Sequence, residues 1–131
     1  MVGACIITIG DELLIGQVVD TNSAWMAQQL NKAGINVIRR VAVGDSWEEI
    51  WFALDEESKH APVILITGGL GPTGDDITKP LLCKYFNGKM IVDEAALANV
   101  KHIFERVIQR PMLDVNLKPV VSNVRCAIWG N

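Results

Sequence analysis

A glycine-rich and acidic segment carries the strongest sign of chemistry in this sequence. Residues 67–78 read TGGLGPTGDDIT, with four glycines between positions 68 and 74. Glycine lets backbone N–H groups approach an oxyanion, and a helix that begins near Ile77 would add the positive end of its dipole. Threonine hydroxyls in the segment are further hydrogen-bond donors. The residues expected to hold phosphate are Gly68, Gly69, Gly71 and Thr73.

The adjacent aspartates Asp75 and Asp76 would repel a phosphate by themselves. They are compatible with it when a divalent cation bridges carboxylate and phosphate, and hard oxygen ligands suit magnesium or manganese. We therefore expect a phosphorylated or nucleotide ligand bound with a metal ion, namely magnesium, manganese or cobalt. The alternative is that the glycines only form turns and that Asp76 caps the following helix.

Two further polar loops follow predicted strands, GDE at 10–12 with DTN at 20–22, and VGD at 43–45. In open α/β sheets, ligands bind at the carboxyl ends of strands. Three such loops together favour a ligand site over ordinary turns. The site residues expected from these two loops are Gly10, Asp20 and Asn22 for the nucleotide, Asp11 for the metal and Asp45 for catalysis. In isolation, Asp11 would be an ordinary loop charge and Asp45 a turn residue before the Ser46 cap.

Strands and helices must alternate to position these loops. Apolar runs at 4–9, 35–43 and 62–67 predict strands, and 10–20 is expected to be a loop. Amphipathic spacing and capping residues predict the helices at 20–34, 46–60, 77–86 and 93–110. This order is typical of a three-layer α/β/α domain with a mostly parallel sheet. Residues 119–131 contain strand-like pieces without a closing helix, which predicts a truncation at the carboxyl end.

Composition excludes several classes of protein. The 131 residues suit one domain, 1–131, and half of them are hydrophobic. The net charge is −3 and no basic run occurs, which argues against nucleic acid as a partner. No segment is long and apolar enough to predict a membrane span. The three cysteines are far apart, which indicates reduced thiols in a cytoplasmic protein.

Three segments together resemble a known family. ITIGDELLIGQVVDTNSAWMAQQL, VAVGD and TGGLGPTGDDITK closely resemble the amino-terminal domain of the competence/damage-inducible protein family, CinA. That domain is similar to the molybdopterin-binding domain of molybdenum cofactor biosynthesis proteins. The resemblance runs from about residue 4 to about residue 118 and includes R-P-M-x-x-x-N at 110–116. Family members continue with a G-T-A-P-G-like loop, and its absence here predicts an incomplete cleft.

The resemblance implies a three-layer α/β/α fold that binds a nucleotide or pterin-like phosphate between these loops. Asp45 and Asp76 match aspartates that the molybdopterin relatives need for adenylyl transfer. Domains of the CinA type are associated instead with metal-dependent hydrolysis of ADP-ribose to AMP and ribose 5-phosphate, which we take as the leading expectation. The alternatives are a pterin- or nucleotide-binding module without hydrolysis, and a non-catalytic interaction protein. For the superfamily, self-association as a homo-oligomer is expected.

Overall fold

The computed structural model describes residues 1–71 and 73–109. The chain divides into two compact units, residues 1–69 and residues 70–131, and each is described by itself. The predicted motif at 110–116 and the strand-like pieces at 119–131 lie outside the described residues. The description of the chain as one domain, truncated at its carboxyl end, therefore stays a prediction.

The first unit is built on a parallel sheet of three strands in the order β2-β1-β3. These strands are β1 (Gly3–Ile9), β2 (Asn36–Val43) and β3 (Val63–Thr67). In the central strand every residue from Ala4 to Ile9 is buried, because neighbours cover both of its edges and both of its faces. The three predicted strands and their parallel arrangement are confirmed.

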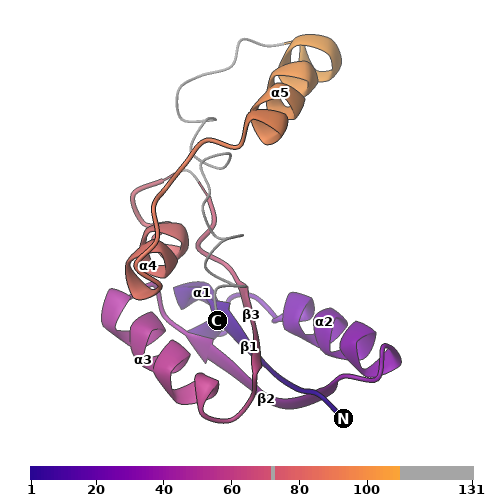
Figure 1. The fold of residues 1–131 in the computed structure, drawn as a ribbon, viewed down its shortest axis with the longest axis vertical. Helices are drawn as coiled ribbons and strands as arrows, with labels where there is room; N and C mark the ends of the chain where they lie inside the picture. The colour runs from indigo at the N-terminus through magenta and orange to yellow at the C-terminus, as the bar shows by residue number, and fades with distance from the viewer. Residues whose placement is uncertain (72, 110–131) are drawn as a thin grey trace. The chain divides into compact units, whose positions relative to one another are not determined.

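Helices cover both faces of this sheet (Figure 1). The helix α2 (Thr21–Lys32) follows β1, and α3 (Trp47–Ser58) follows β2. Successive side chains of a strand point to opposite faces. Accordingly, Arg40 of β2 contacts Ser23 of α2, whereas its neighbour Arg39 contacts Glu57 of α3. The first unit therefore has the expected α/β/α layers.

Local sequence explains where these helices begin. The carboxylate of Asp20 accepts the backbone N–H of Ser23 at the start of α2, and the Ser46 hydroxyl accepts that of Glu49 at the start of α3. The loop expected at 10–20 is wrong in one respect, because it contains the short helix α1 (Asp11–Leu14). Its acidic first turn complements the helix dipole, and Gly16, with φ of 74°, follows its end.

The second unit contributes the helices expected near 77–86 and 93–110. They are α4 (Thr78–Tyr85) and α5 (Glu94–His102), and the latter continues as a π-helix, η1 (Ile103–Ile108). Pro80 lies in the first turn of α4, where its missing N–H costs no hydrogen bond. None of the described helices is both long and apolar enough to cross a membrane.

Candidate functional site

A cavity of about 140 Å³ opens at the carboxyl ends of β1 and β3. Thr8 and Ile9 line it from β1, and Thr67 and Gly68 from the end of β3. The chain passes from β1 to β2 on one side of the central strand and then to β3 on the other. Ligands of open α/β sheets bind where the strand order reverses in this way. The other lining residues are Glu12, Leu13, Val18, Val19, Asp20, Thr21 and Asn22.

Asp20, in the wall of this cavity, is linked to β1 directly through Thr8 and to β2 indirectly, through Ser23 and Arg40. Its Oδ2 accepts the hydroxyls of Thr8 at 3.0 Å and Ser23 at 2.5 Å, and its Oδ1 accepts the Ser23 N–H at 3.0 Å. The Arg40 Nε donates in turn to the Ser23 hydroxyl at 3.2 Å. Burial acts to raise the pKa of Asp20, but the Ser23 and Thr8 hydrogen bonds and the charge of Arg40 outweigh it. The pKa therefore lies below its usual value, which keeps a carboxylate at the cavity.

Gly68 lets the ends of β1 and β3 approach each other at the cavity. Its φ is 98°, a conformation that residues with side chains rarely adopt. A Cβ at this position would also collide with the carbonyl oxygen of Ile9. Gly69 has a φ of 64° as well. The backbone conformation at these two positions favours glycine, and the predicted role of both residues in holding phosphate stays a prediction.

Asp11 and Asp45 lie together at the ends of β1 and β2. The Asp45 N–H donates to Asp11 Oδ1 at 2.9 Å, and the Asp11 N–H donates to Asp45 Oδ2 at 3.3 Å. Glu49 belongs to the same group, because a Cβ on Gly44 would lie 2.6 Å from Asp11 Oδ1 and 2.7 Å from Glu49 Oε2. The structure thus brings the first and second predicted acidic loops together at one edge of the sheet.

In the second unit, the glycine-rich loop closes on Asp76. Its Oδ2 accepts the backbone N–H of Thr73 at 3.1 Å and the Thr73 hydroxyl at 2.7 Å. The hydroxyl bond, followed by those from the backbone of Thr73 and Gly71, lowers the pKa of Asp76 despite partial desolvation. Asp76 does not cap α4, whose N-cap residue is Ile77. The loop therefore presents donors to an anion, and in this structure the anion is its own carboxylate.

The predicted metal ligands divide between the two units, with Asp11 in the first and Asp75 and Asp76 in the second. Across the described residues, no group of three or more histidine, cysteine, aspartate or glutamate side chains is arranged to hold a metal ion. Magnesium commonly binds through one or two carboxylates together with substrate phosphates and water. The carboxylates of Asp11 in one unit and of Asp75 and Asp76 in the other are ligands of the kind that this mode uses, and the metal itself stays a prediction.

The hydrogen-bond network around Asp20 also contains Thr8, Ser23 and Arg40, none of which belongs to a predicted motif. Thr8 belongs to the apolar run that predicts a strand, yet it is 5% exposed and hydrogen-bonded to Asp20. Ser23 lies in the first turn of α2, within the segment predicted as a helix, yet it is fully buried. A hydroxyl in the last turn of an otherwise aliphatic strand, next to a capping aspartate, is the signal that would have indicated this network.

A model of a known protein family matches most of this chain. The model of a family described as "Probable molybdopterin binding domain" matches residues 5–128. The chain belongs to this family. That match confirms the resemblance drawn from the three sequence segments.

Individual proteins are similar to this chain in sequence and in structure. A CinA-like protein of Flavobacterium psychrophilum is 42% identical over 128 residues, which are 98% of this chain and 31% of the relative. The chain thus spans about three tenths of the length of that relative. The crystal structure of CinA, of unknown function, from Thermoplasma acidophilum matches with a TM-score of 0.78 and 32% identity, over 92% of this chain and 69% of that one.

The tungsten cofactor synthesizing protein MoaB of Pyrococcus furiosus has a similar structure. It matches with a TM-score of 0.64 and 26% identity, over 82% of this chain and 65% of that one. The mixed α/β fold with a parallel sheet is therefore the fold of molybdopterin-binding-like proteins.

Proposed function

We propose that this chain is a nucleotide-binding domain of CinA type that hydrolyses ADP-ribose to AMP and ribose 5-phosphate with a divalent metal ion. The observation that supports it most is the cavity at the reversal of strand order, with the Asp20 carboxylate in its wall. The reciprocal pair of Asp11 and Asp45 lies at the end of the adjacent strand β2. Binding groups and acidic groups thus occupy the sheet edge where α/β enzymes hold ligands.

The chemistry of the cavity indicates which part of the ligand it would hold. A volume of about 140 Å³ suits a fragment of a nucleotide, not the whole. The ionised Asp20 accepts hydrogen bonds and repels phosphate, so it suits a ribose hydroxyl. Asn22 also lines the cavity and offers both a donor and an acceptor. For the phosphates we propose the glycine-rich loop, with Gly68, Gly69, Gly71 and Thr73. The Gly10 N–H, also expected to bind the nucleotide, instead donates to the Val43 carbonyl oxygen at 2.9 Å.

In this proposal the catalytic residues Asp45 and Asp76, together with Asp11 and Asp75, would hold the cation or orient the attacking water. The cation would neutralise charge on the leaving phosphate when bound. Water adds to one phosphorus of the pyrophosphate, and the bond from that phosphorus to the bridging oxygen breaks. To hold a cation, Asp76 would have to release its bonds to Thr73, and its lowered pKa means that it would do so as a carboxylate without a proton to lose.

The second candidate is a pterin- or nucleotide-binding module that does not hydrolyse its ligand. The description of the matching family and the structural similarity to MoaB favour it. A third candidate is an interaction protein without catalysis. For all three we propose a cytoplasmic protein that self-associates and binds neither nucleic acid nor membranes.

Chromatography of the products separates these candidates. The chain is incubated with ADP-ribose and magnesium, manganese or cobalt, and AMP and ribose 5-phosphate are quantified. We expect metal-dependent AMP that Asp76→Asn removes. Asp93→Asn is the matched control, because Asp93 only caps α5 and asparagine caps equally well.

Full activity of Asp76→Asn would remove the proposed role of this residue. Pterin binding without AMP release would favour the second candidate. If neither product nor binding is found, the same assay on the longer CinA-like protein of Flavobacterium psychrophilum tests whether the activity needs the remaining length.

A further inference from the structure

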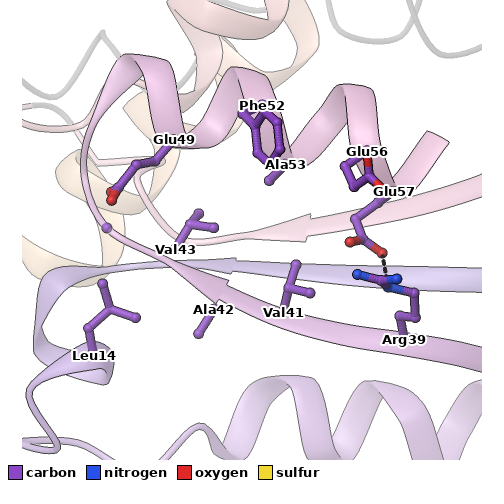
Figure 2. Close-up of a pocket in the computed structure, with 11 residues that line it drawn as sticks. Leu14, Arg39, Val41, Ala42, Val43, Glu49, Phe52, Ala53, Glu56 and Glu57 are labelled. Atoms are coloured by element: carbon purple, nitrogen blue, oxygen red, sulfur yellow. Dashed lines mark ion pairs between the residues drawn. The ribbon is translucent and has the colours of Figure 1, made fainter. Parts of the chain in front are cut away.

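A second hollow in the first unit lies between α3 and β2, away from the cavity at β1 and β3. Its volume is about 380 Å³. Val41 and Val43 form its floor and point toward α3, whose Phe52 and Ala53 form one wall (Figure 2). Leu14 of α1 closes one end. This apolar hollow contains none of the residues that line the first cavity.

The helix α3 presents a second stripe of side chains to this hollow. Ile50, Leu54 and Glu57 are buried in the core of the unit. From α3 the hollow is lined by Glu49, Phe52, Ala53, Glu56 and Glu57, and the first four have the i, i+3, i+4, i+7 spacing of one helix face. Ala53 and Glu57 are buried, so this face overlaps the core-facing one. Phe52 is 69% exposed, although it lies at the middle of this stripe. An exposed aromatic ring between apolar neighbours is typical of an interface anchor.

The charges around the hollow are unequal at its two ends. At one end, Glu57 pairs with Arg39 at 3.0 Å and Glu56 pairs with Lys59 at 3.0 Å. At the other end, Glu49 has no ion-pair partner among the residues that the structure describes, and it lies beside Asp11. An apolar occupant with a positive charge at the Glu49 end would therefore complement the hollow.

Two observations, on the edge of β2 and on the exposure of Phe52, indicate what kind of partner would fill the hollow. Addition of a strand to the outer edge of β2 is disfavoured, because its register shifts opposite Ala4 and Cys5 and the charged pair Arg39 and Arg40 lies in its middle. A small-molecule pocket usually encloses most of its ligand. Here the aromatic ring stands largely in solvent, which suits an extended protein surface. A partner helix that lies along α3 would add no strand to β2 and would cover the exposed ring with an extended surface.

We propose that this hollow binds an amphipathic helix of a partner protein, with an apolar face over Phe52 and a lysine or arginine beside Glu49. The apolar face covers Val41, Val43 and Ala53. The basic residue pairs with Glu49 at the edge of the groove. No residue of the first cavity takes part, but Glu49 lies beside Asp11, a proposed cation ligand, so peptide binding is measured directly and not through hydrolysis.

The probe is a synthetic, fluorescently labelled helical peptide of about 15 residues, with leucines at i, i+3, i+4 and i+7 and a lysine at one end. Fluorescence anisotropy measures its affinity for the whole chain. We expect Phe52→Asp and Glu49→Lys each to weaken binding about tenfold or more. A peptide with glutamate in place of the lysine should recover affinity for Glu49→Lys. Glu48→Lys is the matched control, because Glu48 is on the same helix but does not line the hollow.

Circular dichroism of each variant verifies that the chain remains folded, and Phe52→Ser is a milder second test of the anchor. Absence of peptide binding to the wild-type chain overturns the proposal. Equal affinities of wild type, Phe52→Asp and Glu49→Lys overturn it as well. Sedimentation velocity provides the remaining outcome: a dimer that Phe52→Asp dissociates would show that a second copy, not a partner helix, covers the hollow.

Discussion

The carboxylate of Asp76 accepts hydrogen bonds from both the backbone N–H and the hydroxyl of Thr73, at 3.1 and 2.7 Å. The glycine-rich loop is therefore arranged around an anion before any ligand arrives. Under the proposed function, binding of phosphate to these donors would require the Asp76 carboxylate to leave them.

Replacement of Thr73 by valine should raise the pKa of Asp76. The Thr73 hydroxyl is the largest cause of the lowered pKa, and valine keeps the shape without that donor. Titration of the Asp76 carboxyl carbon by NMR measures the change. Thr21→Val, an exposed threonine at the start of α2, is the control and should leave the pKa where it is.

The lowered pKa of Asp76 also predicts how the effect of Thr73→Val on stability depends on pH. A folded pKa below the unfolded value of about 3.9 contributes stability above that value, and the contribution disappears as the pH falls through the folded pKa. Thr73→Val should therefore weaken the second unit at neutral pH and have little effect in strong acid. An equal loss of stability at both pH values would show that Asp76 is not responsible.

Gly68→Ala should destabilise the first unit more than Gly34→Ala. Both glycines have positive φ, 98° and 79°, so alanine costs about 1 kcal/mol at either position from the backbone alone. At Gly34 the new Cβ meets open space, whereas at Gly68 it collides with the Ile9 carbonyl oxygen. Urea unfolding of both variants measures the difference. Equal losses would mean that β1 and β3 can separate at this point without cost.

Asp20→Ala should cost more than the loss of a helix cap. Removal of a capping side chain costs about 1 kcal/mol, and each hydroxyl left without its partner adds about 1 kcal/mol or more. In addition to capping α2, Asp20 accepts hydrogen bonds from the hydroxyls of Thr8 and Ser23. Asp93 caps α5 through the Ala96 N–H. Amide hydrogen exchange in α2 and α5 compares Asp20→Ala with Asp93→Ala. Similar losses of protection would show that the network adds nothing to the cap.

Arg39→Ala should destabilise the first unit by about 3 kcal/mol, because it leaves a buried carboxylate without a cation. The Glu57 side chain is 3% exposed and lies 3.0 Å from the Arg39 Nε. Its Oε2 is held by charge attraction, since the contact is not aligned as a hydrogen bond and that oxygen accepts no other among the described groups.

Lys59→Ala is the matched control for Arg39→Ala. It removes the pair with Glu56, which is of equal length but exposed, and exposed pairs contribute less than about 1 kcal/mol. Thermal unfolding compares the two variants. If both lose the same stability, Arg39 is too exposed for its pair with Glu57 to count as buried.

The fold could be predicted because its signals are local. The aliphatic run in β1, the Asp20 and Ser46 caps and the stop at Gly34 each need only a few residues to be recognised. The short helix α1 was missed because four residues have too little periodicity to show in a sequence.

The site could be predicted only in part. Topology alone required the loops after β1 and β2 to meet, and Asp11 and Asp45 do so. Sequence could not show that Asp76 turns back onto Thr73, because side-chain direction within a loop depends on the whole backbone path. Nor could it show that Thr8 and Ser23 share one carboxylate, since their contact spans a strand, a loop and a helix.

The reciprocal hydrogen bonds of Asp11 and Asp45 couple the loop that follows β1 to the loop that follows β2. Each carboxylate holds the backbone of the other loop, across 34 residues of sequence. A ligand that withdraws one carboxylate therefore releases the backbone of the other loop. Occupancy at the end of β1 would then be felt at the end of β2 without any contact between the ligand and the second loop.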